Sequence, residues 1–121
     1  MNDANLRLVR RFIHIAEPSL VDMSDVGAPG CGTPGCIIGW ALYASGNPSC
    51  GDWKAARNFM DLEPKLFDRL TLANFADCEI ARHRLTKQDV LTAIDSVLAN
   101  PNIVMPNWPP AVQRMIIDDE Q

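Results

Sequence analysis

The feature that most constrains the fold is a segment, residues 35–45, that is apolar nearly all round. It carries Ile37 and Trp40 among other apolar side chains and contains no charged residue. A helix without a polar face has to be buried on all sides. We therefore predict that residues 35–45 form the central helix of the fold, started by Thr33-Pro34 as an N-terminal cap and ended by Gly46.

The rest of the chain predicts further helices around this one. The apolar residues recur at helical spacing in several segments, which are residues 5–17, 52–60, 64–70, 86–100 and 110–117. Thr86 and Asp89 stand in the positions of a capping box in its acidic variant. One short strand, residues 102–105, is the only exception that we expect. The sequence thus predicts an all-α fold, an irregular five- to six-helix bundle around the buried helix 35–45.

Length and composition bound the organisation of the chain. With 121 residues, 47% of them hydrophobic and 21% charged, the sequence predicts one helical domain over residues 1–121. Within it, residues 101–110 form a proline-rich segment that precedes a short C-terminal helix. No apolar run approaches the roughly 18 residues of a membrane span, and residues 1–11 lack the features of a secretory signal. We therefore expect a cytoplasmic protein with reduced cysteines and no membrane partner.

The charge of the chain limits its partners. Eleven basic and fifteen acidic residues give a formal net charge of −4, which disfavours nonspecific nucleic-acid binding. Three basic residues, Arg7, Arg10 and Arg11, nevertheless cluster near the N-terminus. Arginine and tryptophan are the commonest interface hot spots, so we predict that this cluster and Trp108 contact a partner protein. Trp40 and Trp53 are assigned to the core.

One motif contains side chains that can carry chemistry, Cys31-Gly-Thr-Pro-Gly-Cys36. The simplest interpretation is structural, because free cysteine is among the most buried residue types. In that case the glycines turn the chain, Thr-Pro caps the helix, and the two thiols only pack in the core.

A second interpretation makes the motif half of a zinc site. Cys31 and Cys36 would be two ligands, at a spacing on the edge of the usual range. The ligand set would be completed from the remaining candidates, which are Cys50, Cys78, His83 and His14. Zinc is thus the one cofactor that the sequence allows, and otherwise we expect none.

A third interpretation makes Cys36 the nucleophile of a thiol enzyme. A cysteine in the first turn of a helix feels the positive end of the helix dipole, which favours the thiolate. The spacing is not the Cys-x-x-Cys of thiol oxidoreductases, however, and no strand–helix–strand pattern surrounds it. No catalytic constellation is evident elsewhere, so the sequence favours a protein without enzymatic activity.

Other polar residues have simpler interpretations. His14 is expected to be an ordinary residue of the first helix, and His83, between two arginines, a solvated surface residue. Asp118, Asp119 and Glu120 are expected to form a frayed, solvated tail.

The run Cys31-Gly-Thr-Pro-Gly-Cys-Ile-Ile-Gly-Trp-Ala41, preceded by Asp22-Met-Ser24, resembles uncharacterised small bacterial and bacteriophage proteins. These share a Cys-Gly-Thr-x-x-Cys-x-x-Gly-Trp-Ala core, and the likeness extends over about residues 6–98. The resemblance implies an accessory protein of phages or mobile elements, a context in which small acidic proteins often inhibit host proteins. It implies no activity and no catalytic residue.

Taken together, these features favour a non-enzymatic protein-binding module. The resemblance adds that this module inhibits a host defence complex in the manner of an anti-CRISPR protein, with an unidentified host or phage protein as its partner. The alternatives are a small zinc-stabilised domain that uses Cys31 and Cys36 and a thiol enzyme that acts through Cys36.

Overall fold

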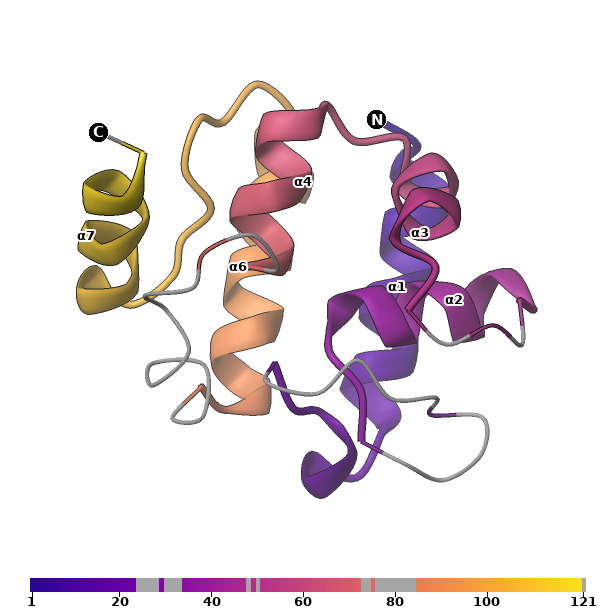
Figure 1. The fold of residues 1–121 in the computed structure, drawn as a ribbon. Helices are drawn as coiled ribbons and strands as arrows, with labels where there is room; N and C mark the ends of the chain where they lie inside the picture. Colours follow the sequence, from indigo (N-terminus) through magenta and orange to yellow (C-terminus); the bar gives the residue numbers. More distant parts are fainter. Residues whose placement is uncertain are drawn as a thin grey trace.

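The computed structural model describes residues 1–23, 29, 34–47, 49, 51–72, 75 and 85–120. These residues form six α-helices and a short 3₁₀ helix, namely α1 (Asp3–Ile15), η1 (Pro18–Leu20), α2 (Ile37–Ser45), α3 (Trp53–Met60), α4 (Pro64–Thr71), α6 (Lys87–Ala99) and α7 (Pro110–Asp119). The described part of the chain contains no strand, so the prediction of a strand at residues 102–105 is wrong. The prediction of an all-α bundle is confirmed (Figure 1).

Helix α2 is the buried centre that its sequence predicted, but it starts later than expected. Its residues from Ile37 to Leu42 are all buried, and Gly46 ends the helix in the left-handed conformation, with φ of 75°. Residue 36, not Thr33, is the N-cap. The helix starts here because Gly35 is held extended, forming a parallel bridge with Val21 and donating its N–H to the Leu20 carbonyl at 3.0 Å.

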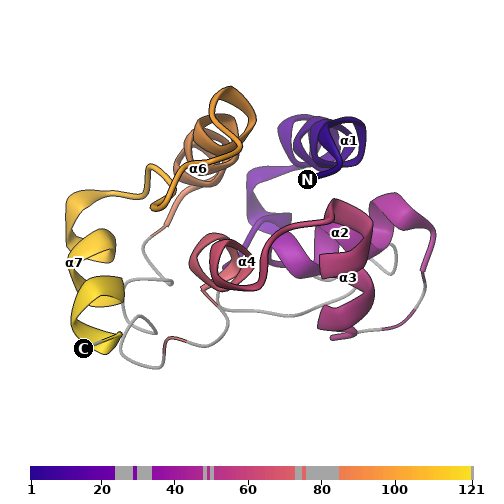
Figure 2. The same ribbon diagram turned by 90° about the horizontal axis from the view of Figure 1, so that it is seen from above.

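Helices α1 and α6 pack side by side in antiparallel directions (Figures 1 and 2). The Lys87 ammonium, at the start of α6, donates to the carbonyls of His14 and Ala16 at the end of α1. These are carbonyls that a helix end leaves without intrahelical partners. Both sides of the predicted capping box are present at Thr86 and Asp89, which confirms this start of α6.

Helices α3 and α4 follow their predicted positions closely. The Asp52 side chain accepts from the N–H of Ala55 at 3.1 Å and caps α3. The Glu63 side chain accepts from the N–H of Leu66 at 3.1 Å and caps α4. Between the two helices, Asp61 takes the left-handed conformation with φ of 51°, which turns the chain sharply.

Helix α7 lies on the opposite side of α4 and α6 from α1 (Figures 1 and 2). It runs to Asp119, beyond the expected end at residue 117, and buries Val112 and Ile116. The buried apolar residues of all six helices belong to one contiguous cluster. Among the described residues, no helix is long and apolar enough to cross a membrane.

Candidate binding groove between α1 and α6

The three N-terminal arginines lie in a groove between α1 and α6. The groove has a volume of about 530 Å³, and its lining comprises Arg7, Arg10, Arg11, His14, Asp95, Leu98 and Ala99. The sequence had grouped the arginines but not His14, and the residues contributed by α6 were not predicted. Three guanidinium groups therefore face one carboxylate and a small apolar floor.

Helical periodicity places these side chains together. Residues 7, 10, 11 and 14 are spaced by three or four, so they share one face of α1. The buried residues of the helix, Leu6, Val9 and Ile13, occupy a different face. Helix α1 thus packs with one stripe and presents cations with another.

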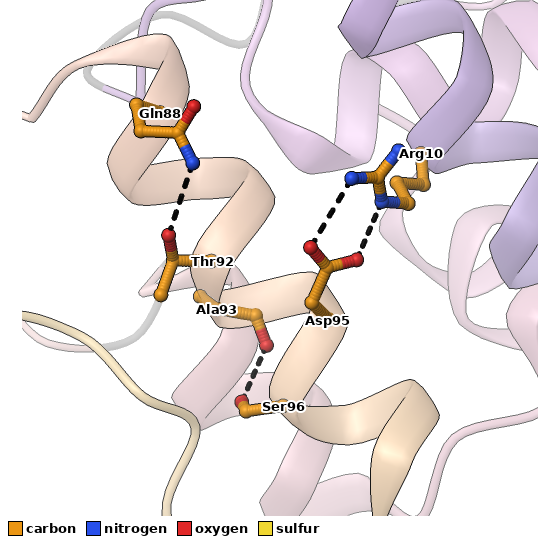
Figure 3. A network of polar contacts seen from close by, with 6 residues as sticks. All are labelled: Arg10, Gln88, Thr92, Ala93, Asp95 and Ser96. Carbon is orange, nitrogen blue, oxygen red and sulfur yellow. Dashed lines mark hydrogen bonds and ion pairs between the residues drawn. The ribbon is translucent and has the colours of Figure 1, made fainter.

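Arg10 is held by Asp95 in a two-point ion pair across the groove. Its Nε lies 2.5 Å from Asp95 Oδ1, and its Nη2 lies 3.2 Å from Oδ2 (Figure 3). The hydrogen bond to Asp95 raises the pKa of the Arg10 guanidinium above its ordinary value. This pair shows that the groove accommodates a carboxylate in the fork-to-fork geometry that arginine prefers.

Arg7, Arg11 and His14 differ in whether their side chains have hydrogen-bonding partners. The Nε of Arg7 donates to Asp3 at 2.6 Å, four residues earlier on the exposed surface of α1. The side chains of Arg11 and His14 make no hydrogen bond or ion pair with any residue that the structure describes. Arg11 is therefore the arginine of the groove without a described partner, and the His14 imidazole lines the groove with it.

The burial of Trp53 and Trp108 is the reverse of what the sequence predicted. Trp108, expected on the surface, is only 1% exposed, and its Nε1 donates to the Arg69 carbonyl at 2.9 Å. It is therefore no surface anchor, because the indole is buried and bonded to α4. Trp53, expected in the core, is 46% exposed, since it stands at the first position of α3 on its outer side. Trp40 is buried as predicted.

A second arginine–carboxylate pair joins α4 to the end of α7. Arg69 donates from Nε and Nη2 to the two Glu120 oxygens at 2.9 and 2.6 Å, and from Nη1 to the Val104 carbonyl at 2.6 Å. The bond to Arg69 holds the pKa of Glu120 below its ordinary value. Glu120 is thus not part of a solvated tail. No pattern in the sequence predicts this pair, because its members lie far apart along the chain.

Of the cysteines predicted to carry chemistry, only Cys36 belongs to the described residues. It is 5% exposed and lies at the N-cap of α2, not in its first turn. Cys31, Cys50, Cys78 and His83 lie outside the described residues, so the proposed zinc set is not placed. Among the residues that are described, no three side chains of His, Cys, Asp or Glu come close enough to hold a metal ion.

Comparison with known proteins found no matching family model, no matching curated protein and no matching solved structure. The resemblance to small bacterial and phage proteins stays a prediction.

Proposed function

We propose that this protein is a non-enzymatic binding module that takes an acidic segment of a partner protein in the groove between α1 and α6. The observation that carries the proposal is the lining of the groove, in which three arginines meet one carboxylate of α6. Such a local excess of positive charge is notable in a chain of net charge −4. Complementary charge of this kind steers encounter and selects partners.

The contacts within the groove support a carboxylate ligand. Within the groove Asp95 already pairs with Arg10, and Arg7 pairs with Asp3 outside the lining, while Arg11 and His14 have no such partner among the described residues. Leu98 and Ala99 add an apolar floor for a side chain between two acidic residues. An amphipathic helix with glutamates on one face fits these requirements.

The test uses a synthetic helical peptide with glutamates and one leucine on a single face, followed by fluorescence anisotropy. Arg11→Glu is expected to weaken binding about tenfold, because it replaces an attraction by a repulsion. Arg114→Glu is the matched control, since Arg114 is an exposed cation of α7 outside the groove. Equal weakening by both variants, or binding of an oligonucleotide in preference to the peptide, overturns the proposal.

The identity of the partner as a host defence complex rests on the sequence resemblance alone. Metal analysis of protein purified without a metal-affinity step separates the proposal from the zinc alternative. One zinc per chain, with unfolding by a chelator, favours a zinc-stabilised domain. Rapid alkylation of one native thiol favours the thiol enzyme.

A further inference from the structure

Trp53 is an exposed aromatic residue that the groove does not use. Tryptophan is a largely buried residue type on average, and the other two tryptophans of the chain, Trp40 and Trp108, are 5% and 1% exposed. Trp53 alone keeps 46% of its surface in contact with solvent. It is therefore the one tryptophan that a partner can reach.

The Trp53 ring is held in place from two sides. Its centroid lies 6.5 Å from that of the buried Phe67 ring, with 37° between the planes. On its own helix, the Lys54 ammonium lies 5.6 Å and the Arg57 guanidinium 5.8 Å from the ring centroid. Cations at these distances interact favourably with an indole face. The exposed ring is thus pre-ordered, which lowers the entropy lost when a partner binds.

We propose that Trp53, Lys54 and Arg57 form a second docking surface, which takes a protein segment bearing an apolar side chain between carboxylates. The two cations outnumber the one carboxylate beside them, Asp52, which accepts the Ala55 N–H as the cap of α3, so these residues together carry a net positive charge. The apolar side chain packs against the indole, and the flanking carboxylates pair with Lys54 and Arg57. Tryptophan and arginine together are the commonest centre of a binding hot spot. This surface is independent of the α1–α6 groove.

The test exploits the burial of the other tryptophans. Because Trp40 and Trp108 are buried, acrylamide quenching of the native protein reports mainly on Trp53. The probe is a short peptide with one leucine flanked by glutamates, compared with the same peptide flanked by lysines. Binding of the acidic peptide is expected to shift the tryptophan emission to the blue and to protect it from acrylamide.

Four variants locate the effect, and their affinities are measured by fluorescence anisotropy of a labelled peptide, because the Trp53 variants lack the tryptophan reporter. Trp53→Ala is expected to weaken binding about 30-fold, the size of a hot-spot loss, and Trp53→Phe to retain most of it. Ile117→Ala is the matched control, because Ile117 is 48% exposed and lies on α7, across the molecule from α3 (Figure 2). Arg57→Glu is expected to weaken the acidic peptide and to leave the fold intact.

The outcomes separate this surface from its rivals. Loss of binding in Trp53→Ala and Arg57→Glu, with Ile117→Ala unchanged, supports the inference. Equal binding of the lysine-flanked peptide, or unchanged binding by Trp53→Ala, overturns it. Protection of Trp53 by oligothymidylate but not by the acidic peptide also overturns it and marks a base-stacking surface. Arg11→Glu leaves this binding unchanged, so a failure here is distinct from a failure of the groove.

Discussion

Two arginine–carboxylate pairs of similar geometry lie in contrasting environments. The side chains of Arg10 and Asp95 are 33% and 48% exposed, at the rim of the groove. Those of Arg69 and Glu120 are 10% and 24% exposed, where the end of α7 meets α4. Both pairs make two hydrogen bonds, so the difference between them is solvent and not contact geometry.

Because of this difference in exposure, the two pairs have separate roles. Water screens the Arg10–Asp95 pair, so it adds little stability but orients a charge toward the groove. The Arg69–Glu120 pair is partly desolvated, and Arg69 also bonds to the Val104 carbonyl. Removing one of its members leaves polar groups without partners, which is costly. The buried pair therefore fastens α7 to α4, whereas the exposed pair shapes a binding surface.

The largest effect is expected at Trp108, which packs beside the buried pair. Trp108→Ala is expected to lower the free energy of unfolding by about 3–5 kcal/mol, because it empties a large buried site and loses the bond to the Arg69 carbonyl. Denaturant titration measures the loss. Trp53→Ala is the control, with an expected loss of about 1 kcal/mol or less. Similar losses in both variants would contradict the contrast between buried and exposed regions.

The next effect compares the two pairs directly. Arg69→Met is expected to cost about 2–4 kcal/mol, reduced from the value of a fully buried pair because Glu120 retains some solvent contact. Arg10→Met is expected to cost about 0.5 kcal/mol. Double-mutant cycles with Glu120→Gln and Asp95→Asn give the coupling energies. A larger coupling at the exposed pair would reverse the assignment.

A smaller effect appears on acidification. The pKa of Glu120 is lowered in the folded state, chiefly by its hydrogen bond to Arg69, so its stabilising contribution is complete above the unfolded pKa of about 4.3. It is lost as the pH falls from there through the folded value. Melting curves of wild type and Glu120→Gln are expected to converge over this range. Glu17→Gln serves as the control, and a gap in melting temperature that persists in acid would disprove the role of Glu120.

The smallest effect is expected at Asp95. Asp95→Asn removes the carboxylate that occupies Arg10, which leaves three guanidinium groups in the groove without that counter-charge. The acidic helical peptide is expected to bind about two- to threefold more tightly, with a stability change below about 1 kcal/mol. Anisotropy titrations at low and high salt measure this, and weaker binding by Asp95→Asn would show that Asp95 itself holds the ligand.

Local patterns in the sequence predicted most helices correctly. Helix ends are set by contacts between residues a few positions apart, as at Asp52, Thr86 and Gly46. Such contacts can be predicted from the local sequence. The predicted start of α2 was wrong because Gly35 is held by Val21, a residue distant in sequence. Patterns among neighbouring residues do not predict such a pairing.

The candidate site was predictable only on one side. The arginines of the groove share one helix, so their spacing alone groups them. Asp95 and Leu98 join them only through the packing of α6 against α1. The exchange of Trp53 and Trp108 has the same origin, because composition does not say which side of a helix meets another. Composition also does not predict that Glu120 pairs with Arg69.

The bridge between Val21 and Gly35 joins the end of η1 to the start of α2. Its two ends are fixed by two backbone hydrogen bonds, and the Trp40 indole donates to the Leu20 carbonyl at 3.1 Å beside them. The first residue of α2 is therefore set by a contact with η1, so a change in η1 that breaks this contact acts on α2 as well.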